Sequence, residues 1–272
     1  MLYSKKLGSI RVCAAYFFGK IGCNGRLFVF LDKNNYFFKK TLFYFFVGYF
    51  ILWKSLTWFG KIIDRVYLDS QGWQGIRQRG EILKSVLRQV IQDNFEQGVT
   101  TNLLDVACGG GRYDLEVLLD FSGGAVNALL RDYKAENVQK AQELALHLGV
   151  SATIEQADAF NDDDLNRVLP PPNLIVVSGL HEILPDNELI RQHFQQLYRL
   201  LEPGGTLIFT IQPYHPQLEF IARVLNSHTG KPWVMRLRPL ELTEAWATDA
   251  GFQDFQVQMD NFNIFGVVKA RK

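Results

Sequence analysis

The chain has 272 residues, which is enough for one sizeable α/β domain and an extension. Its net charge of +1 is unevenly distributed, because residues 1–62 carry ten Lys or Arg and a single acid, Asp32. This segment therefore has a net charge of +9, and −8 remains for residues 63–272. It also holds 18 of the 36 aromatic residues, so the composition predicts a domain boundary near Ile62.

The cysteine content excludes a disulfide-stapled fold and a cysteine metal site. Cys13, Cys23 and Cys108 form neither a paired framework nor a Cys-x-x-Cys motif. No metal-binding cluster stands out in the sequence, and the nucleophile motif Gly-x-Ser-x-Gly of hydrolases is absent. We therefore expect a protein of the reducing cytoplasm, with no metal site and no hydrolase chemistry.

The first 62 residues are more aromatic and basic than an ordinary folded domain. Residues 41–53 carry no charge and are flanked by Lys39, Lys40 and Lys54. Because a bilayer span takes about 20 apolar residues, we expect this segment to lie at the membrane interface. A true span and an ordinary packed region are the alternatives. Basic residues favour the anionic inner face of a membrane, whereas nucleic acid is a less suitable partner because the aromatic residues run together.

A helix is predicted before the first strand. Seven apolar residues between residues 82 and 95 fall on one helical face, and Gly98 ends the pattern. This face consists of Ile82, Leu83, Val86, Leu87, Val90, Ile91 and Phe95. Trp73, Arg77 and Arg79 precede it, where arginines commonly do no more than solvate the start of a helix.

Residues 101–112 combine a strand, a glycine turn and the start of a helix. Leu103, Leu104 and Val106 form an apolar run that is typical of a strand buried on both faces. The run stops at three consecutive glycines, which let the backbone approach a ligand beside the free amides of a helix N-terminus. The dinucleotide fingerprint Gly-x-Gly-x-x-Gly does not fit, because Asp114 stands where the third glycine belongs.

Further strands follow this turn at regular intervals. Four buried strands are predicted at residues 125–130, 152–156, 173–177 and 206–211, with helical patterns between them. Two more strands, near residues 255–259 and 264–270, close the chain. The alternation predicts a doubly wound α/β fold, in which ligands bind outside the carboxyl ends of the strands.

The spacing Asp105-x-Ala107-x-Gly109-x-Gly111 resembles the first motif of class I S-adenosylmethionine-dependent methyltransferases, an acid followed by Gly-x-Gly-x-Gly. Ala107 replaces the first glycine and would slightly crowd the turn. Three more motifs resemble this family in order: an acid after the second strand, an acid after the third, and a Pro-Gly-Gly turn into the fifth.

The resemblance extends from about residue 70 to the C-terminus. It implies a Rossmann-like sheet of seven strands that ends in an antiparallel pair, which distinguishes a methyltransferase sheet from a dehydrogenase sheet. Residues 178–186 and 212–228 resemble more narrowly a subgroup of bacterial methyltransferases, some of them fused or adjacent to an α/β-hydrolase. This closer resemblance says little about the substrate.

The resemblance also implies which residues hold S-adenosylmethionine. Asp132 would accept hydrogen bonds from both ribose hydroxyls, because an ionised carboxylate only accepts. Asp158 would accept from the adenine amino group; the alternative is a helix cap, for which residues 161–164 compete. The implied cofactor-binding residues are Asp105, Ala107, Cys108, Gly109, Gly111, Asp132, Tyr133, Asp158, Ala159 and Ser178.

The methyl acceptor is expected at the ends of the fourth and fifth strands. A general base is needed there only if the acceptor must lose a proton, and the catalytic candidates are His181, Glu182 and His215. A structural role, in which His181 orders the loop through a backbone hydrogen bond, is the alternative. In methyltransferases a helix before the first strand often covers the pocket, so the candidate substrate contacts are Trp73, Arg77 and Tyr214.

These features predict an S-adenosylmethionine-dependent methyltransferase attached to the inner face of a membrane, with a small-molecule or lipid acceptor. One alternative is a non-catalytic protein that keeps the fold and binds the cofactor, for which Ala107 is the only hint. The other is a nicotinamide-dependent oxidoreductase, which Asp114 and the closing strand pair disfavour.

Overall fold

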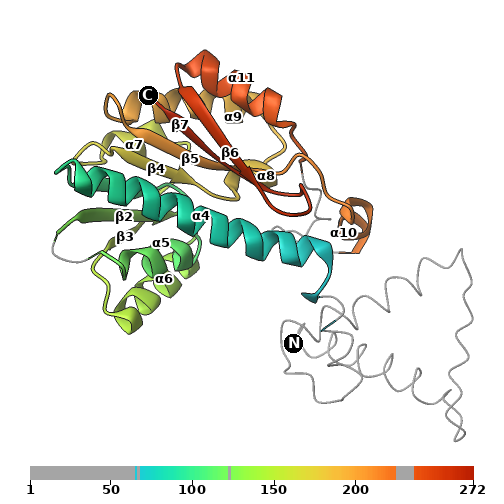
Figure 1. Cartoon of the computed structure of the whole chain (residues 1–272), viewed down its shortest axis with the longest axis horizontal. Coiled ribbons are helices and arrows are strands. Elements are labelled where there is room, and N and C mark those ends of the chain that lie inside the picture. The colour runs from blue at the N-terminus through green and yellow to red at the C-terminus, as the bar shows by residue number, and fades with distance from the viewer. Residues whose placement is uncertain (1–64, 66–67, 122–123, 225–235) are drawn as a thin grey trace, which may run out of the picture. The chain divides into compact units, whose positions relative to one another are not determined.

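The structure is a computed structural model that describes residue 65 and residues 68–121, 124–224 and 236–272 (Figure 1). The basic extension of residues 1–62 lies outside the described residues, so its membrane attachment and the boundary near Ile62 stay predictions. Within the described residues, none of the helices combines the length and hydropathy that a bilayer span requires.

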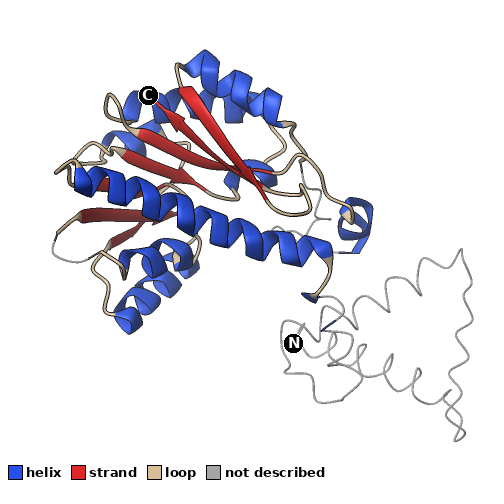
Figure 2. Cartoon of the chain, viewed as in Figure 1, coloured by secondary structure: helices blue, strands red, loops and turns tan. Residues whose placement is uncertain are grey.

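Seven strands of the described region form one mixed sheet in the order β3-β2-β1-β4-β5-β7-β6. Figure 2 shows the strands of this sheet in red, with blue helices packed around them. Strands β1 to β5 pair in parallel, and β7 pairs antiparallel with both β5 and β6. The strands are β1 Thr101–Asp105, β2 Val126–Asp132, β3 Thr153–Gln156, β4 Leu174–Val177, β5 Thr206–Ile211, β6 Gln253–Met259 and β7 Gly266–Arg271. The predicted seven-stranded α/β sheet with a closing antiparallel pair is confirmed.

Helices cover both faces of this sheet. One face carries α4, α5 and α6, and the other carries α7, α9 and α11. The helices of the described region are α4 Gln71–Glu96, α5 Arg112–Leu118, α6 Ala135–Leu148, α7 Asp162–Asn166, α8 Leu180–Ile183, α9 Asn187–Leu200, α10 Leu218–Val224 and α11 Leu240–Ala250.

Alternating strand side chains build a separate hydrophobic core on each face. Leu103 of β1 and Leu174 of β4 pack into the core under α4, whereas their neighbours Leu104 and Ile175 pack into the core under α9. Because both faces are covered, the parallel strands are apolar at nearly every position. This is why these strands appear in the sequence as continuous apolar runs.

Helix α4 begins at Gln71, well upstream of its apolar pattern. Gly72 and Gly75 disfavour a helix by about 1 kcal/mol each relative to alanine, but they allow close packing. A Cβ on Gly72 would lie 2.8 Å from His215 Nε2, and one on Gly75 would lie 3.0 Å from Asp260 Oδ2. Tertiary contact therefore extends the helix where local propensity would not.

Several helix ends follow the predicted capping residues. The Asp186 carboxylate caps α9 by accepting from the amides of Glu188 and Leu189, and Asn161 caps α7 in the same way. Gly149 ends α6 with a φ of +68°. The short helices α7, α8 and α10 escape the sequence pattern, because one or two turns show no clear periodicity.

Candidate active site

The glycine turn after β1 leaves space above its backbone. A Cβ built on Gly109 or Gly110 would meet no atom within 4 Å. A Cβ on Gly111 would instead meet side chains of α5, α6 and β2 at 3.3–3.4 Å, so this glycine allows close packing. The φ angles of Gly109 and Gly111 are +58° and +66°, whereas Ala107 has no positive φ and does not require glycine.

A buried acid pair lies beneath the turn. Asp105 is fully buried, with Oδ1 accepting from the amide of Ala107 at 2.8 Å and Oδ2 from the hydroxyl of Tyr113 at 2.5 Å. Burial raises the pKa of Asp105 to about 7. Burial and the charge of Asp105 raise the pKa of its neighbour Asp114 well above the usual value. Cys108 is also buried, which raises the pKa of its thiol, so it packs as an unreactive side chain.

Asp132, at the end of β2, reaches back to the glycine turn. Its Oδ2 accepts from the amide of Gly109 at 2.9 Å. Its Oδ1 accepts from the amide of Lys134 and from Asn137 Nδ2, both at 2.9 Å. Since a carboxylate has about four acceptor positions, one remains for a ligand hydroxyl. Accepting from both ribose hydroxyls would require one of the protein donors to move. Tyr133 follows and is 69% exposed.

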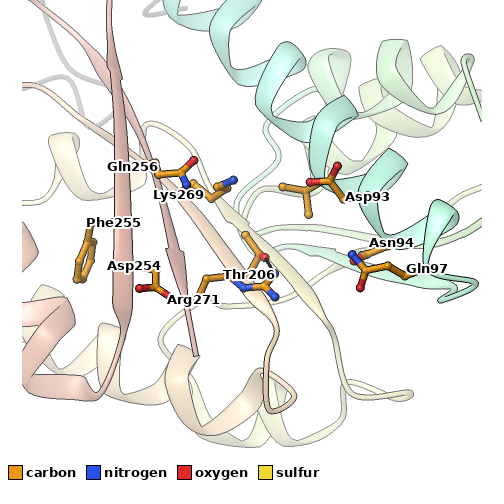
Figure 3. Close-up of a pocket in the computed structure, with 10 residues that line it drawn as sticks. Asp93, Asn94, Gln97, Thr206, Asp254, Phe255, Gln256, Lys269 and Arg271 are labelled. Atoms are coloured by element: carbon orange, nitrogen blue, oxygen red, sulfur yellow. Dashed lines mark hydrogen bonds between the residues drawn. The ribbon is translucent and has the colours of Figure 1, made fainter.

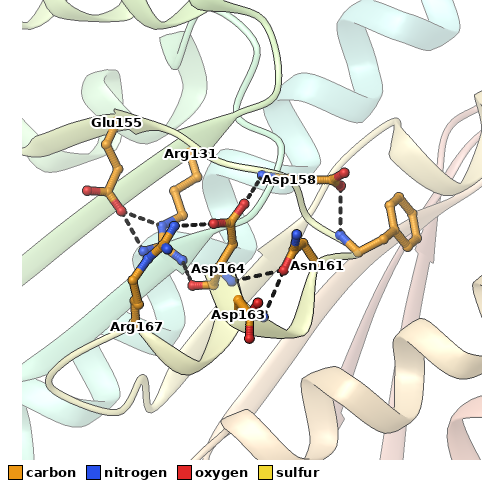
Figure 4. A network of polar contacts seen from close by, with 8 residues as sticks. Arg131, Glu155, Asp158, Asn161, Asp163, Asp164 and Arg167 are labelled. Carbon is orange, nitrogen blue, oxygen red and sulfur yellow. Dashed lines mark hydrogen bonds and ion pairs between the residues drawn. The ribbon is translucent and has the colours of Figure 1, made fainter.

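Asp158 lies after β3 in a polar network with the start of α7 (Figure 4). Its Oδ1 accepts from the amide of Phe160 at 3.0 Å, and its own amide donates to Asp164 Oδ2 at 2.7 Å. Because Asn161 is the cap of α7, Asp158 is not required as a cap. In the described part of the chain its Oδ2 has no hydrogen-bond partner, so it can accept from a ligand amine. Ala159, beside it, is buried.

The carboxyl ends of β4 and β5 meet in a second polar cluster. The amide of Gly179 donates to Thr210 Oγ1 at 2.8 Å, and the Thr210 hydroxyl donates to Glu182 Oε1 at 2.6 Å. Glu182 is buried, and its Oε2 has no partner among the described residues. Burial raises the pKa of Glu182. Ser178, which is half-buried, connects β4 to this cluster.

Helix α4 adds a positive charge to this cluster. A Cβ built on Gly179 would lie 3.8 Å from both terminal nitrogens of Arg79. The guanidinium carbon of Arg79 also lies 5.2 Å from the ring centroid of Phe265. Its charge lowers the pKa of Glu182 and so opposes the effect of burial. Arg77, by contrast, is exposed.

His181 is engaged within the protein interior. Its Nε2 lies 2.9 Å from Nδ1 of His193, and its ring meets Phe194 at a centroid distance of 5.1 Å. Burial lowers the pKa of His181 well below its usual value and that of His193 to about 3. Arg238 Nη1 donates to the carbonyl of His181 at 2.6 Å. This geometry favours the structural role for His181, with a histidine partner that the sequence pattern did not reveal.

The remaining candidates lie on α4 and after β5. His215 is buried, with Nδ1 accepting from the amide of Gln217 at 3.1 Å, and burial lowers its pKa. Trp73 is half-buried on α4, and Tyr214 is 54% exposed. Their contacts with a substrate stay predictions, as does catalysis by His215.

A pocket of about 480 Å³ lies at the opposite edge of the sheet (Figure 3). Its walls include Asp93 and Asn94 near the end of α4, Thr206 at the start of β5, and Lys269 and Arg271 of β7. This is the edge where the parallel strands begin. Because open α/β sheets bind ligands beyond the carboxyl ends of their strands, the pocket is not the candidate active site.

Comparison with protein families agrees with the fold that the sheet order indicates. Residues 49–272 match the family described as "Putative methyltransferase". The chain belongs to this family. It is 43% identical over 215 residues to the uncharacterized protein YnbC of Escherichia coli K12, an alignment that covers 78% of this chain and 37% of YnbC. The chain thus spans little more than a third of the length of this relative.

Solved structures share the fold of this methyltransferase-family protein at low identity. A possible exported protein from Bordetella parapertussis is 21% identical with a TM-score of 0.61, covering 77% of this chain and 72% of that one. Apo SibL, an S-adenosylmethionine-dependent methyltransferase, is 17% identical with a TM-score of 0.54. The match covers 74% of this chain and 57% of SibL. Magnesium protoporphyrin IX methyltransferase from Synechocystis, solved with bound S-adenosylhomocysteine (SAH), is 15% identical with a TM-score of 0.51. The match covers 78% of this chain and 99% of that enzyme. The shared fold is that of S-adenosylmethionine-dependent methyltransferases.

The residues at the carboxyl edge fit the cofactor that this fold implies. The amide of Ala157 donates to the carbonyl of Asp132 at 3.1 Å, so Asp132 and Asp158 stand at neighbouring strand ends. Both carboxylates keep an acceptor position, and the space above Gly109 adjoins Asp132. Acceptor-only groups suit the diol and the amino group of a nucleoside.

Proposed function

We propose that this protein transfers a methyl group from S-adenosylmethionine to a small-molecule or lipid acceptor. The observation that carries the proposal is the open glycine turn, whose Gly109 amide is held by Asp132. This turn follows β1, whose sheet neighbour is β4, and the strand order reverses between these two strands. Ligands of doubly wound sheets bind at such a point. Family membership supports the same reaction.

The bound cofactor would supply a methyl group that is already activated on a sulfonium. The protein's task is then to position both partners and to exclude water. Asp132 and Asp158 would hold the nucleoside at the ends of β2 and β3. The acceptor would lie beside it, at the ends of β4 and β5, near Glu182 and Arg79.

We further propose that residues 1–62 attach the protein to the inner face of a membrane. Their charge of +9 and their 18 aromatic residues support an interfacial location. Each basic residue near anionic lipid contributes about 1 kcal/mol, so even partial contact adds up.

Calorimetry with S-adenosylhomocysteine tests the cofactor assignment. We expect saturable binding of one equivalent to the full-length protein. The absence of heat at about 500 μM ligand, with folding confirmed by circular dichroism, would reject the assignment, because such weak binding corresponds to less than about 4.5 kcal/mol. Titration with NADH in the same cell checks the nicotinamide alternative.

Transfer is tested separately with radiolabelled S-adenosylmethionine. Lipid, small-molecule, protein and nucleic-acid fractions of a cell extract are incubated with the protein one at a time. We expect label in the lipid or the small-molecule fraction. Cofactor binding without label in any fraction would instead support the non-catalytic alternative, for which Ala107 is the sequence hint.

A further inference from the structure

Glu182 of α8 has a buried oxygen without a partner. Its side chain is fixed through Oε1, which accepts from the Thr210 hydroxyl at 2.6 Å, and Thr210 in turn accepts from the amide of Gly179 at 2.8 Å. The residue is only 6% exposed, and Oε2 has no hydrogen-bond partner among the described residues. An unpaired buried acceptor costs about 1–3 kcal/mol. A group that donates a hydrogen bond to Oε2 would remove this cost.

Arg79 brings a positive charge to the same place. Its guanidinium rests on the ring of Phe265, and its charge acts on Glu182. Burial raises the pKa of Glu182, and the charges of Arg79 and Arg238 partly oppose this effect by favouring the ionised form. The other titratable groups packed here are His181 and His193, whose low pKa values keep them neutral.

The sheet topology puts Glu182 at the end of β4, next to the strand that carries the proposed cofactor turn. Helix α8 follows β4 directly, and β4 is the sheet neighbour of β1, which carries the glycine turn. His181, the other candidate base on α8, already has its Nε2 occupied by His193 at 2.9 Å. Glu182 is thus the group of α8 with an acceptor atom to spare.

We propose that the acceptor is a hydroxyl group and that Glu182 is the general base that removes its proton. This inference rests on the methyl transfer proposed above. The hydroxyl donates to Glu182 Oε2, and Arg79 stabilises the oxyanion that develops. A neutral amine or a carboxylate would need no base. A carboxylate would also place a second acceptor against Oε2, which lacks a donor.

The step balances without another reactant. The hydroxyl proton passes to Glu182 Oε2 while the acceptor oxygen forms a bond to the methyl carbon. The carbon–sulfur bond breaks, and its electron pair stays on sulfur. The products are a methyl ether and S-adenosylhomocysteine, and the proton on Glu182 passes to solvent after they leave.

The chemical stability of the labelled product identifies the acceptor class. Full-length protein is incubated with methyl-tritiated S-adenosylmethionine and with the small-molecule and lipid fractions of a cell extract. We expect label that survives alkali and is released by hot hydriodic acid as methyl iodide, as from a methyl ether. Methyl esters would release volatile methanol in alkali, and N-methyl groups would resist both treatments.

Two variants test the roles of the side chains. Glu182→Gln should lower kcat by about 10²–10⁴-fold, the usual contribution of a general base, with unchanged affinity for S-adenosylhomocysteine. Its residual rate should rise about tenfold per pH unit, because the hydroxyl must then ionise by itself, whereas the wild-type rate should level off once Glu182 is ionised. Arg79→Met should lower kcat by about a hundredfold.

The matched controls are ion-paired surface residues that have no part in the proposed reaction. Glu188→Gln on α9 affects contacts to Arg191 and Gln192, and Arg88→Met on α4 removes the ion pair with Asp120. Because these contacts are all exposed, both variants should keep the wild-type rate. Label lost in alkali, or a Glu182→Gln variant as fast as wild type, would overturn the hydroxyl assignment and leave methyl transfer standing. Folded wild-type protein that binds no S-adenosylhomocysteine would overturn the proposed function itself. Cofactor binding without label in any fraction would overturn the inference too.

Discussion

Asp132 connects the glycine turn to the place where a nucleoside would bind. It accepts from the amides of Gly109 and Lys134 and from the side chain of Asn137 before any ligand arrives. These bonds hold the carboxylate in one orientation, so little side-chain entropy would be lost on binding. The same acid therefore shapes the turn and presents an acceptor atom to the ligand.

Asp132→Asn should weaken binding of S-adenosylhomocysteine by about tenfold to a hundredfold. A hydrogen bond to a charged group contributes about 1.5–3 kcal/mol, and the amide group has one acceptor oxygen instead of two. Calorimetry measures the affinity, and a thermal melt checks that the variant is folded. The control is Asp120→Asn, which removes only the exposed ion pair with Arg88. Equal affinities for the two variants would contradict the role of Asp132.

The buried acids Asp105 and Asp114 make stability depend on pH. Burial raises the pKa of Asp105 to about 7, and burial together with Asp105 raises the pKa of Asp114 well above its usual value. Both groups ionise freely in the unfolded chain, near their ordinary pKa of 3.8. Their contribution to stability is therefore fully present below about pH 4 and is lost as the pH rises through the folded-state pKa values.

Asp114→Asn should gain stability relative to wild type as the pH rises above about 4. The asparagine does not titrate, whereas the wild-type acid loses up to about 1.4 kcal/mol of unfolding free energy per pH unit. Urea unfolding of both proteins at several pH values between about 4 and 7 measures the difference. The exposed Asp163 provides the control substitution, Asp163→Asn. A difference that stays constant with pH would show that Asp114 is ionised in the folded protein.

At the scale of elements, α4 has two halves with different partners. Its second half carries the apolar face that packs into the core, including Leu83 and Leu87. Its first half lies against the β6–β7 turn, where Asp260 accepts from the amide of Phe265 at 2.6 Å and leaves room only for Gly75. This contact places Arg79 at the carboxyl edge of the sheet.

Gly75→Ala should lower the melting temperature, and Gly80→Ala should raise it. Both substitutions gain up to about 1 kcal/mol of helix propensity. At Gly75, however, the new methyl would lie 3.0 Å from Asp260 Oδ2, which is fixed by its own hydrogen bond, and overpacking costs about 1–3 kcal/mol. Gly80 has no atom within 4 Å of its Cβ position and is the matched control. Scanning calorimetry measures both, and two equal increases would refute the close contact.

At the scale of the whole molecule, the two parts of the chain have opposite net charges. Residues 1–62 carry +9 and the remaining 210 residues carry −8, so the two parts are suited to different surroundings. An acidic domain with a basic, aromatic extension can bind an anionic bilayer through the extension alone. A lipid acceptor would then be presented to the domain at high local concentration.

Flotation with liposomes should separate the full-length protein from a variant that lacks residues 1–62. We expect the full-length protein to float with vesicles that contain about 30% anionic lipid, and the shortened variant to stay at the bottom of the gradient. About 0.5 M salt should weaken binding by screening without abolishing it, because the aromatic residues also insert. Flotation of the shortened variant would place the membrane contact in the domain instead.

Much of the fold could be predicted from sequence patterns within single strands, helices and turns. The buried run that ends at Asp105, the cap at Asp186 and the Pro-Gly-Gly turn before β5 all agree with the structure. The acids after β2 and β3 could be located because the strand ends are regular. His193 and Thr210 could not be selected in this way, because their partners His181 and Glu182 lie 12 and 28 residues away in sequence and meet them only through packing.

The sequence alone determined the α/β class, because short apolar runs alternate with helical patterns along the chain. It also determined the glycine turn, because glycine adopts positive φ angles at little cost. The tertiary structure decided which polar groups are occupied. His181 was as good a candidate base as Glu182 in the sequence, but α9 pairs His181 with His193, whereas Thr210 holds Glu182 with Oε2 unpaired. The physical reason is that a side chain's basicity and availability depend on its burial and its partners, which come from distant parts of the chain.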